Sequence, residues 1–134
     1  FRPRKSAHAY KTIWTEKGSP LIVFSQQLSM KLAKRYGCDK LLVDCAMRYG
    51  KPALREKLRE FKKQGVEDIV ILPLYPQYSS TTTASIFDVV ADEFVSWRHM
   101  PSLRFVSDYY QSPAYIKAEA DSIRQHWLNH GQAA

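Results

Sequence analysis

The residues best suited to chemistry are two tyrosines and a glutamine that stand among prolines: Tyr75, Gln77 and Tyr78. Prolines stiffen the chain, so these side chains are expected to form a rigid, aromatic and weakly polar wall. Such a wall suits a flat apolar ligand better than a phosphate. The residues alone are equally consistent with a plainer reading, in which a proline-rich strand exit is followed by hydroxyls, Ser79–Thr83, that cap the next helix.

The elements on either side of this wall can be predicted from the apolar pattern. Ile69–Leu72 is a continuous apolar run, which is typical of a strand covered on both faces. Pro73 and Pro76 cannot donate to a sheet ladder, so strand pairing should fade there. The next helix has an apolar stripe at helical spacing: Ile86, Val90, Phe94 and Trp97. In open α/β sheets, ligands bind just beyond the carboxyl ends of strands, where the wall lies.

The rest of the chain alternates between helical and strand patterns. In order, we predict helices at 7–14 and 19–36, a strand at 41–47, a helix opened by Pro52 at 52–64, a strand with its exit at 103–110, and a helix at 113–130. The last helix carries the stripe Ile116, Ala120, Ile123 and Trp127. Such alternation predicts one α/β lobe over 1–134, with a Rossmann-like or flavodoxin-like open parallel sheet and helices on both faces.

Three motifs give this sequence a family resemblance. Leu74–Thr83, which reads Leu-Tyr-Pro-Gln-Tyr-Ser-Ser-Thr-Thr-Thr, resembles the conserved loop of ferrochelatases, the terminal enzymes of haem synthesis. Lys17–Leu21, with the amphipathic helix after it, and Met47–Gly50 are similar to two further motifs of that family, in the same order and separation. The resemblance covers about 10–129. It implies a chelatase-type sheet that is incomplete, corresponding to the larger part of the N-terminal lobe.

The resemblance implies contacts with a porphyrin at the first two motifs. Ser19 aligns with a serine that lies against the porphyrin, although helix capping explains a serine there equally well. Arg48 and Tyr49 align with an Arg-Tyr pair in the cleft wall, where Arg48 is suited to pairing with a propionate or lining the pocket. Tyr10 lies two residues before Thr12, the position at which some members carry a tyrosine, and it is included as a further contact.

The third motif implies contacts at the other edge of the porphyrin. Tyr75, Gln77 and Tyr78 align with the family's loop there, and core packing is the alternative role for Tyr75. Some members carry a cysteine that ligates an iron–sulfur cluster at the position of Ser80. A serine hydroxyl cannot replace that thiolate, so no cluster is implied, and no other bound cofactor is expected.

The activity implied by the resemblance is insertion of Fe²⁺ into protoporphyrin to give protohaem. The reaction needs a base, and the family's histidine and its acidic partner are expected outside this chain, in a second domain. No catalytic residue is therefore assigned, and the chain alone is expected to be inactive. Two alternatives stay open: a non-catalytic flavodoxin-like module for a flat aromatic ligand, and half of a homodimeric short chelatase. The second is disfavoured because no histidine stands at a predicted strand exit.

The net charge and the cysteines limit the classes of binding partner and the cellular compartment that are expected. The net charge is +7, concentrated at residues 2–5 and on the helix after Pro52. No nucleic-acid-binding signature accompanies it, so nucleic acid is not expected, whereas peripheral contact with an acidic membrane surface is compatible with it. Cys38 and Cys45 form no redox or metal motif, which favours a reducing compartment, the cytoplasm. No apolar run approaches the ~20 residues that span a bilayer.

Two expectations concern metals and self-association. Of the four histidines, only His126 and His130 share a metal-ligand spacing, at i and i+4. A solvated surface pair is the favoured interpretation, so no metal site is predicted. The resemblance also places a further strand between the segments 41–47 and 69–75. Without it, two apolar strand edges are left to pair with each other or with another chain.

Overall fold

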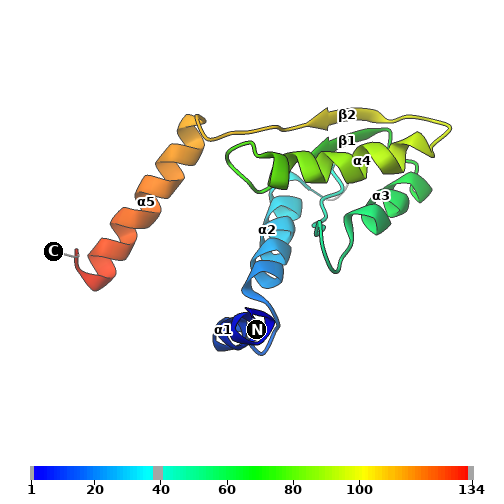
Figure 1. Cartoon of the computed structure of the whole chain (residues 1–134). Coiled ribbons are helices and arrows are strands. Elements are labelled where there is room, and N and C mark those ends of the chain that lie inside the picture. Colours follow the sequence, from blue (N-terminus) through cyan, green and yellow to red (C-terminus); the bar gives the residue numbers. More distant parts are fainter. Residues whose placement is uncertain (1, 38–40, 133–134) are drawn as a thin grey trace. The chain divides into compact units, whose positions relative to one another are not determined.

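A computed structural model describes the backbone of residues 2–37 and 41–132, and the side chains from Ser6 onward within those ranges (Figure 1). The chain divides into two compact units, Phe1–Ala53 and Leu54–Ala134. Each unit has its own set of elements and is described by itself. Cys38 lies outside the described residues.

The first unit contains two helices joined by a tight turn. Helix α1 (Arg2–Ile13) covers the predicted 7–14 helix as far as Ile13 and extends it toward the N-terminus. Helix α2 (Pro20–Tyr36) begins after Ser19 as predicted. Gly37 ends it with a positive φ of 81°, a conformation that glycine adopts without steric cost, and its N–H donates to the Ala33 carbonyl at 3.0 Å.

The strand predicted at 41–47 is wrong. The segment has no ladder: Met47 forms one isolated parallel bridge with Ala53, and its N–H donates to the Pro52 carbonyl at 2.7 Å. Leu41 and Leu42 are exposed. A strand needs hydrogen bonds from a neighbouring strand, and the described residues of this unit supply none beyond that bridge.

The helix predicted to open at Pro52 begins two residues later, as α3 (Leu54–Lys63). Ala53 is held in the bridge with Met47 and the Pro52 carbonyl accepts the Met47 N–H, so the helix begins only after these two residues. Leu58 is buried on this helix, and Leu54 and Phe61, at helical spacing from it, are partly buried beside the core.

The second unit contains a parallel pair of strands. Strand β1 (Asp68–Ile71) pairs with β2 (Ser102–Phe105), with Ile69 opposite Leu103 and Ile71 opposite Phe105. Figure 1 shows the two strands side by side, with α4 (Ser85–Val95) running along them. A parallel pair whose connection contains a helix is the unit from which open α/β sheets are built, so the predicted α/β, chelatase-type class is confirmed.

The core of this unit lies on one face of the strand pair. It is formed by residues from α3, β1, α4 and the segment after α4: Leu58, Ile69, Val90, Phe94 and Trp97. The predicted α4 stripe is therefore correct. The expectation that β1 is covered on both faces is not met within this unit, because Val70, on the opposite face, keeps 63% of its surface exposed.

One buried acid joins α3 to α4. Glu93 of α4 is only 2% exposed, and its carboxylate accepts hydrogen bonds from Arg59 Nε at 2.9 Å and Arg55 Nη1 at 3.1 Å. The indole N–H of Trp97 donates to the same carboxylate at 3.3 Å. A buried carboxylate requires such partners, so this network compensates for the cost of burying its charge.

The last helix, α5 (Pro113–His130), follows Ser112 and ends at Gly131, as predicted. Its predicted apolar stripe is present but uncovered: none of the residues of α5 is buried, and Ile116, Ile123 and Trp127 are exposed. A helix forms from its own backbone hydrogen bonds, so an apolar stripe can be present without cover. No described residue of this unit packs over the apolar stripe of α5 so as to bury it.

Candidate functional site

The loop after β1 is held at the carboxyl end of both strands. The Val106 N–H donates to the Ile71 carbonyl at 3.0 Å, which continues the pairing one residue beyond β2. Farther along, the Pro76 carbonyl accepts two N–H groups, from Tyr109 at 2.9 Å and Tyr110 at 3.0 Å. The two strand exits are therefore tied together at the edge where ligands bind in open α/β sheets.

The three predicted contact residues of this loop lie on its surface. Tyr75 and Tyr78 are exposed, and Gln77 is exposed between them. Their neighbour Pro73 is buried and anchors the start of the loop. The alternative role of Tyr75 in core packing is therefore wrong for this structure. The loop presents an aromatic and amide surface on a fixed backbone, which suits a flat ligand.

The hydroxyl run after this loop has a defined capping residue, Ser79. Its Oγ accepts the Thr81 N–H at 3.3 Å, and its carbonyl accepts the N–H of Ala84 at 3.1 Å, which makes the first turn a π-helix, η1 (Ser80–Ala84). The plainer reading of the run as capping is thus confirmed for Ser79. Thr83 is fully buried, and its Oγ1 has no hydrogen-bond partner among the described residues.

In the first unit, Ser19 occupies the N-cap position of α2. Its carbonyl accepts the Val23 N–H at 3.0 Å, but its side chain makes no capping hydrogen bond. The side chain is half-buried. The capping explanation therefore accounts for the backbone of Ser19 and not for its hydroxyl, which leaves that hydroxyl available to a ligand.

Arg48 and Tyr49 are in contact. The guanidinium carbon of Arg48 lies 4.5 Å from the centroid of the Tyr49 ring, a cation–π arrangement. Tyr49 is 75% exposed and Arg48 is half-buried. The pair combines a positive charge with a flat aromatic surface, the combination expected of a wall that receives a planar anion.

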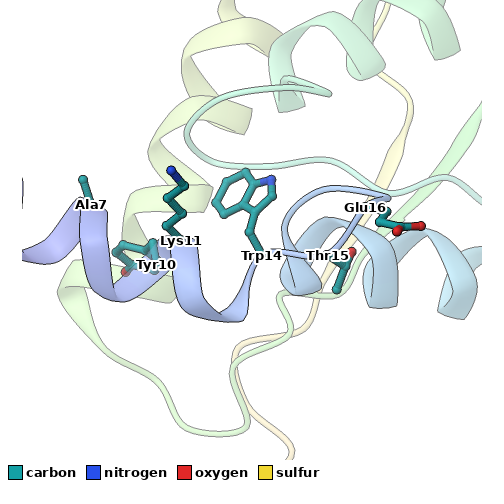
Figure 2. Close-up of a pocket in the computed structure, with 6 residues that line it drawn as sticks. All are labelled: Ala7, Tyr10, Lys11, Trp14, Thr15 and Glu16. Carbon is teal, nitrogen blue, oxygen red and sulfur yellow. The ribbon is translucent and has the colours of Figure 1, made fainter.

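Tyr10 lines an open pocket on α1 and the turn that follows it, together with Ala7, Lys11, Trp14, Thr15 and Glu16 (Figure 2). The pocket volume of about 670 Å³ lies within the range of small-molecule sites, roughly 300–1,000 Å³. Two hydrogen bonds between Thr15 and Gly18, at 3.0 and 2.9 Å, close the turn and lead directly to Ser19.

Sequence reasoning missed Trp14 as a site residue. The signal was present, because Ala7, Tyr10 and Trp14 recur at the spacing of one helix face. The sequence analysis names only Tyr10 from this face, as a contact implied by the family resemblance. Both aromatic rings are exposed and line the same open pocket, so Trp14 joins Tyr10 as a candidate contact.

The candidate contacts fall into two groups, one in each unit. Tyr10, Ser19, Arg48 and Tyr49 belong to Phe1–Ala53, and Tyr75, Gln77 and Tyr78 to Leu54–Ala134. Within the described residues, no group of three or more histidine, cysteine or acidic side chains is placed to hold a metal ion. No helix in the described part of the chain is long and apolar enough to cross a membrane.

Comparison with known proteins identifies the family. The sequence model of the ferrochelatase family matches residues 1–134. The chain is 54% identical over 133 residues to a ferrochelatase of Methylococcus capsulatus, covering 98% of this chain and 39% of that protein. It is 47% identical to a ferrochelatase of Idiomarina loihiensis, covering 99% of this chain and 37% of the relative. A protein named ferrochelatase 2, of Shewanella oneidensis, is 45% identical, and the match covers 98% of this chain and 41% of that protein.

The matches disfavour the two alternatives, a flat-ligand module without chemistry and a homodimeric short chelatase, because every curated relative above is a ferrochelatase. The chain spans about two fifths of the length of these relatives. With the family match extending over all 134 residues, this chain belongs to the ferrochelatase family.

Proposed function

We propose that this chain is the porphyrin-contacting part of a ferrochelatase, a lyase of haem biosynthesis that inserts Fe²⁺ into protoporphyrin to give protohaem. The observation that carries the proposal is the loop after β1. Its family motif lies at the carboxyl end of a parallel strand pair, tied down by two hydrogen bonds to the Pro76 carbonyl, with Tyr75 and Tyr78 exposed.

The side chains have distinct tasks in this proposal. Arg48 pairs with a propionate of the porphyrin, since a guanidinium recognises a carboxylate through charge and paired hydrogen bonds. Tyr49, Tyr75 and Tyr78 offer aromatic surface to the macrocycle, and the Gln77 amide offers a polar contact at its edge. Ser19 contributes the hydroxyl that its cap position leaves uncommitted.

These residues bind and orient the porphyrin rather than react with it. Metal insertion removes two pyrrole protons, which requires a base, and none of the contact residues named above is suited to that step near neutral pH. Fe²⁺ is a substrate here and is not assigned a ligand on this chain. Ser80 stands where a cluster-ligating cysteine would be needed, so no iron–sulfur cluster is part of the proposal.

The proposal also covers the cellular location, which is the cytoplasm, and the contacts of the chain with a membrane surface and with other copies of itself. Cys45 is a free thiol, which suits a reducing compartment. The basic residues 2–5 are compatible with peripheral contact with an acidic membrane surface, and nucleic acid is not proposed as a partner. In the described part of the chain no further strand pairs with the outer edge of β1 or β2, so self-association through strand pairing is expected at high concentration.

The test is a titration of the 134-residue chain with protoporphyrin, followed by porphyrin absorbance and by quenching of tryptophan fluorescence. Trp14, beside Tyr10 in the pocket, is a suitable reporter. Saturable binding is expected. Arg48→Ala should weaken it by at least about tenfold, because a hydrogen bond to a charged group contributes about 1.5–3 kcal/mol. Ser19→Leu should also weaken it, because the larger side chain fills the position of the hydroxyl.

Matched controls separate the proposal from general damage to the helix. Arg35→Ala and Ser29→Leu change the same residue types at positions of α2 that are not predicted contacts, and should leave the affinity unchanged. The proposal fails if no saturable binding occurs, or if the controls weaken binding as much as the site variants. The chain alone is expected to bind porphyrin without inserting iron, which an assay of Fe²⁺ insertion would check.

A further inference from the structure

Two histidines face each other on the last turns of α5. The rings of His126 and His130 have their centroids 4.4 Å apart and their planes inclined by 20°, so they are stacked. Both side chains are exposed. Residues four apart lie on the same side of a helix, one turn above the other, so the backbone holds the two imidazoles together. This pair belongs to none of the surfaces assigned to the porphyrin.

The hydrogen bonding of His130 favours metal ligation. Its Nδ1 lies 3.1 Å from the carbonyl oxygen of His126. In the tautomer that donates this hydrogen bond, Nδ1 carries the proton and the lone pair of Nε2 is left for a ligand. A histidine that binds a metal typically donates its other N–H to a carbonyl or carboxylate, which fixes the ring. His130 already has that arrangement.

The local charges also favour a cation. The pair lies at the C-terminal end of an 18-residue helix, where the helix dipole places a partial negative charge. The nearest cationic side chains for which contacts are known on this helix, Lys117 and Arg124, are both paired with the Asp121 carboxylate. This one carboxylate offsets one of their two positive charges, and Glu119 on the same helix offsets the other, so α5 carries no net positive charge from its lysine and arginine.

We propose that His126 and His130 form a two-imidazole chelating site for a late first-row divalent cation, with water completing the coordination. Metal–nitrogen bonds of about 2.0–2.1 Å place two neighbouring ligand nitrogens roughly 3 Å apart. Exposed side chains 4.4 Å apart at their centroids reach that separation by small rotations. The affinity order should be Cu²⁺ above Ni²⁺ and Zn²⁺, with Fe²⁺ weaker. The site is independent of the proposed porphyrin function.

The test is a calorimetric titration of the 134-residue chain with Ni²⁺. One equivalent should bind, and His126→Ala and His130→Ala should each weaken binding at least tenfold, because each variant leaves a single imidazole. His8→Ala and His99→Ala remove histidines elsewhere and should have no effect. Circular dichroism should show unchanged helix content, since both substituted positions are exposed.

A variant that exchanges the residues at positions 128 and 130 tests whether binding depends on the spacing of the two histidines. Leu128→His combined with His130→Leu keeps four histidines but moves the second one to i+2, where it points away from His126. Leu128 is exposed, so the helix should tolerate the change. Loss of Ni²⁺ binding in this variant supports the chelate. Binding as tight as in the parent chain, or no saturable binding to the parent below ~1 mM Ni²⁺, overturns it.

Discussion

Replacing Glu93 by glutamine should destabilise the second unit by about 2 kcal/mol. Glutamine keeps the shape of the side chain and one accepting oxygen, but it lacks the negative charge. Its N–H₂ group then faces one of the N–H donors that the carboxylate oxygen accepts in the parent chain. A hydrogen bond between charged groups contributes about 1.5–3 kcal/mol, and Arg59 is 57% exposed, which places its bond at or below the lower end. Weakening the bond from the Trp97 indole adds roughly 1 kcal/mol at most.

The effect of Glu93 should depend on pH in a defined direction. Burial alone would raise the pKa of its carboxyl, but hydrogen bonds from Arg59 and Trp97, and the charge of Arg59, hold that pKa below its ordinary value of 4.5. A group whose pKa is lower in the folded state stabilises the fold above its unfolded pKa. The difference between the parent chain and Glu93→Gln should be constant from neutral pH down to about 5, and should shrink below 4.5.

The assay is urea unfolding followed by tryptophan fluorescence, since Trp97 contacts Glu93 directly. Glu60→Gln is the matched control: Glu60 is half-exposed, pairs with Lys57 three residues earlier, and should change the unfolding free energy by less than about 0.5 kcal/mol. Equal effects of the two substitutions, or a Glu93→Gln effect that does not diminish in acid, would refute the reasoning.

Three further substitutions test the packing of the second unit by the same unfolding assay. Leu58→Ala should cost about 3 kcal/mol, because Leu58 is buried in the core and its truncation leaves a cavity; a cost under about 1 kcal/mol would contradict that burial. Thr83→Val should raise stability by about 1 kcal/mol, since it removes a buried hydroxyl without a partner among the described residues; a loss would show that this hydroxyl is satisfied. Ile69→Thr should cost about 2 kcal/mol while Val70→Thr stays within about 0.5 kcal/mol, and comparable costs would mean that both faces of β1 are covered.

The helices were predictable because their signals are local. Ser19 and Pro20 mark the start of α2 and Gly37 its end, and Pro113 and Gly131 mark α5 in the same way. Capping and termination depend on a few neighbouring residues and on backbone bonds within the helix itself. The stripe of α4 was likewise correct, because helical spacing places its apolar residues on one face whatever they pack against.

The candidate site was predictable from its motifs but not in its bonding. The sequence placed Tyr75, Gln77 and Tyr78 after a strand, where they are found exposed. It could not indicate that the Pro76 carbonyl accepts the N–H groups of Tyr109 and Tyr110, since these residues are more than thirty positions away. The sequence also could not indicate that Ser19 caps α2 through its backbone position while its hydroxyl makes no capping hydrogen bond.

The sequence by itself determined the family, the presence of the helices, the ends of α2 and α5, and the motif that carries the proposed function. Only the tertiary structure decided which apolar runs become strands and which faces are buried. Ile69–Ile71 of the first apolar run pair in parallel with β2, whereas the segment 41–47, whose apolar run is interrupted by Asp44, has one bridge and no ladder. The physical reason is that a helix completes its hydrogen bonds within itself, while a strand and a buried face exist only through residues distant in the chain.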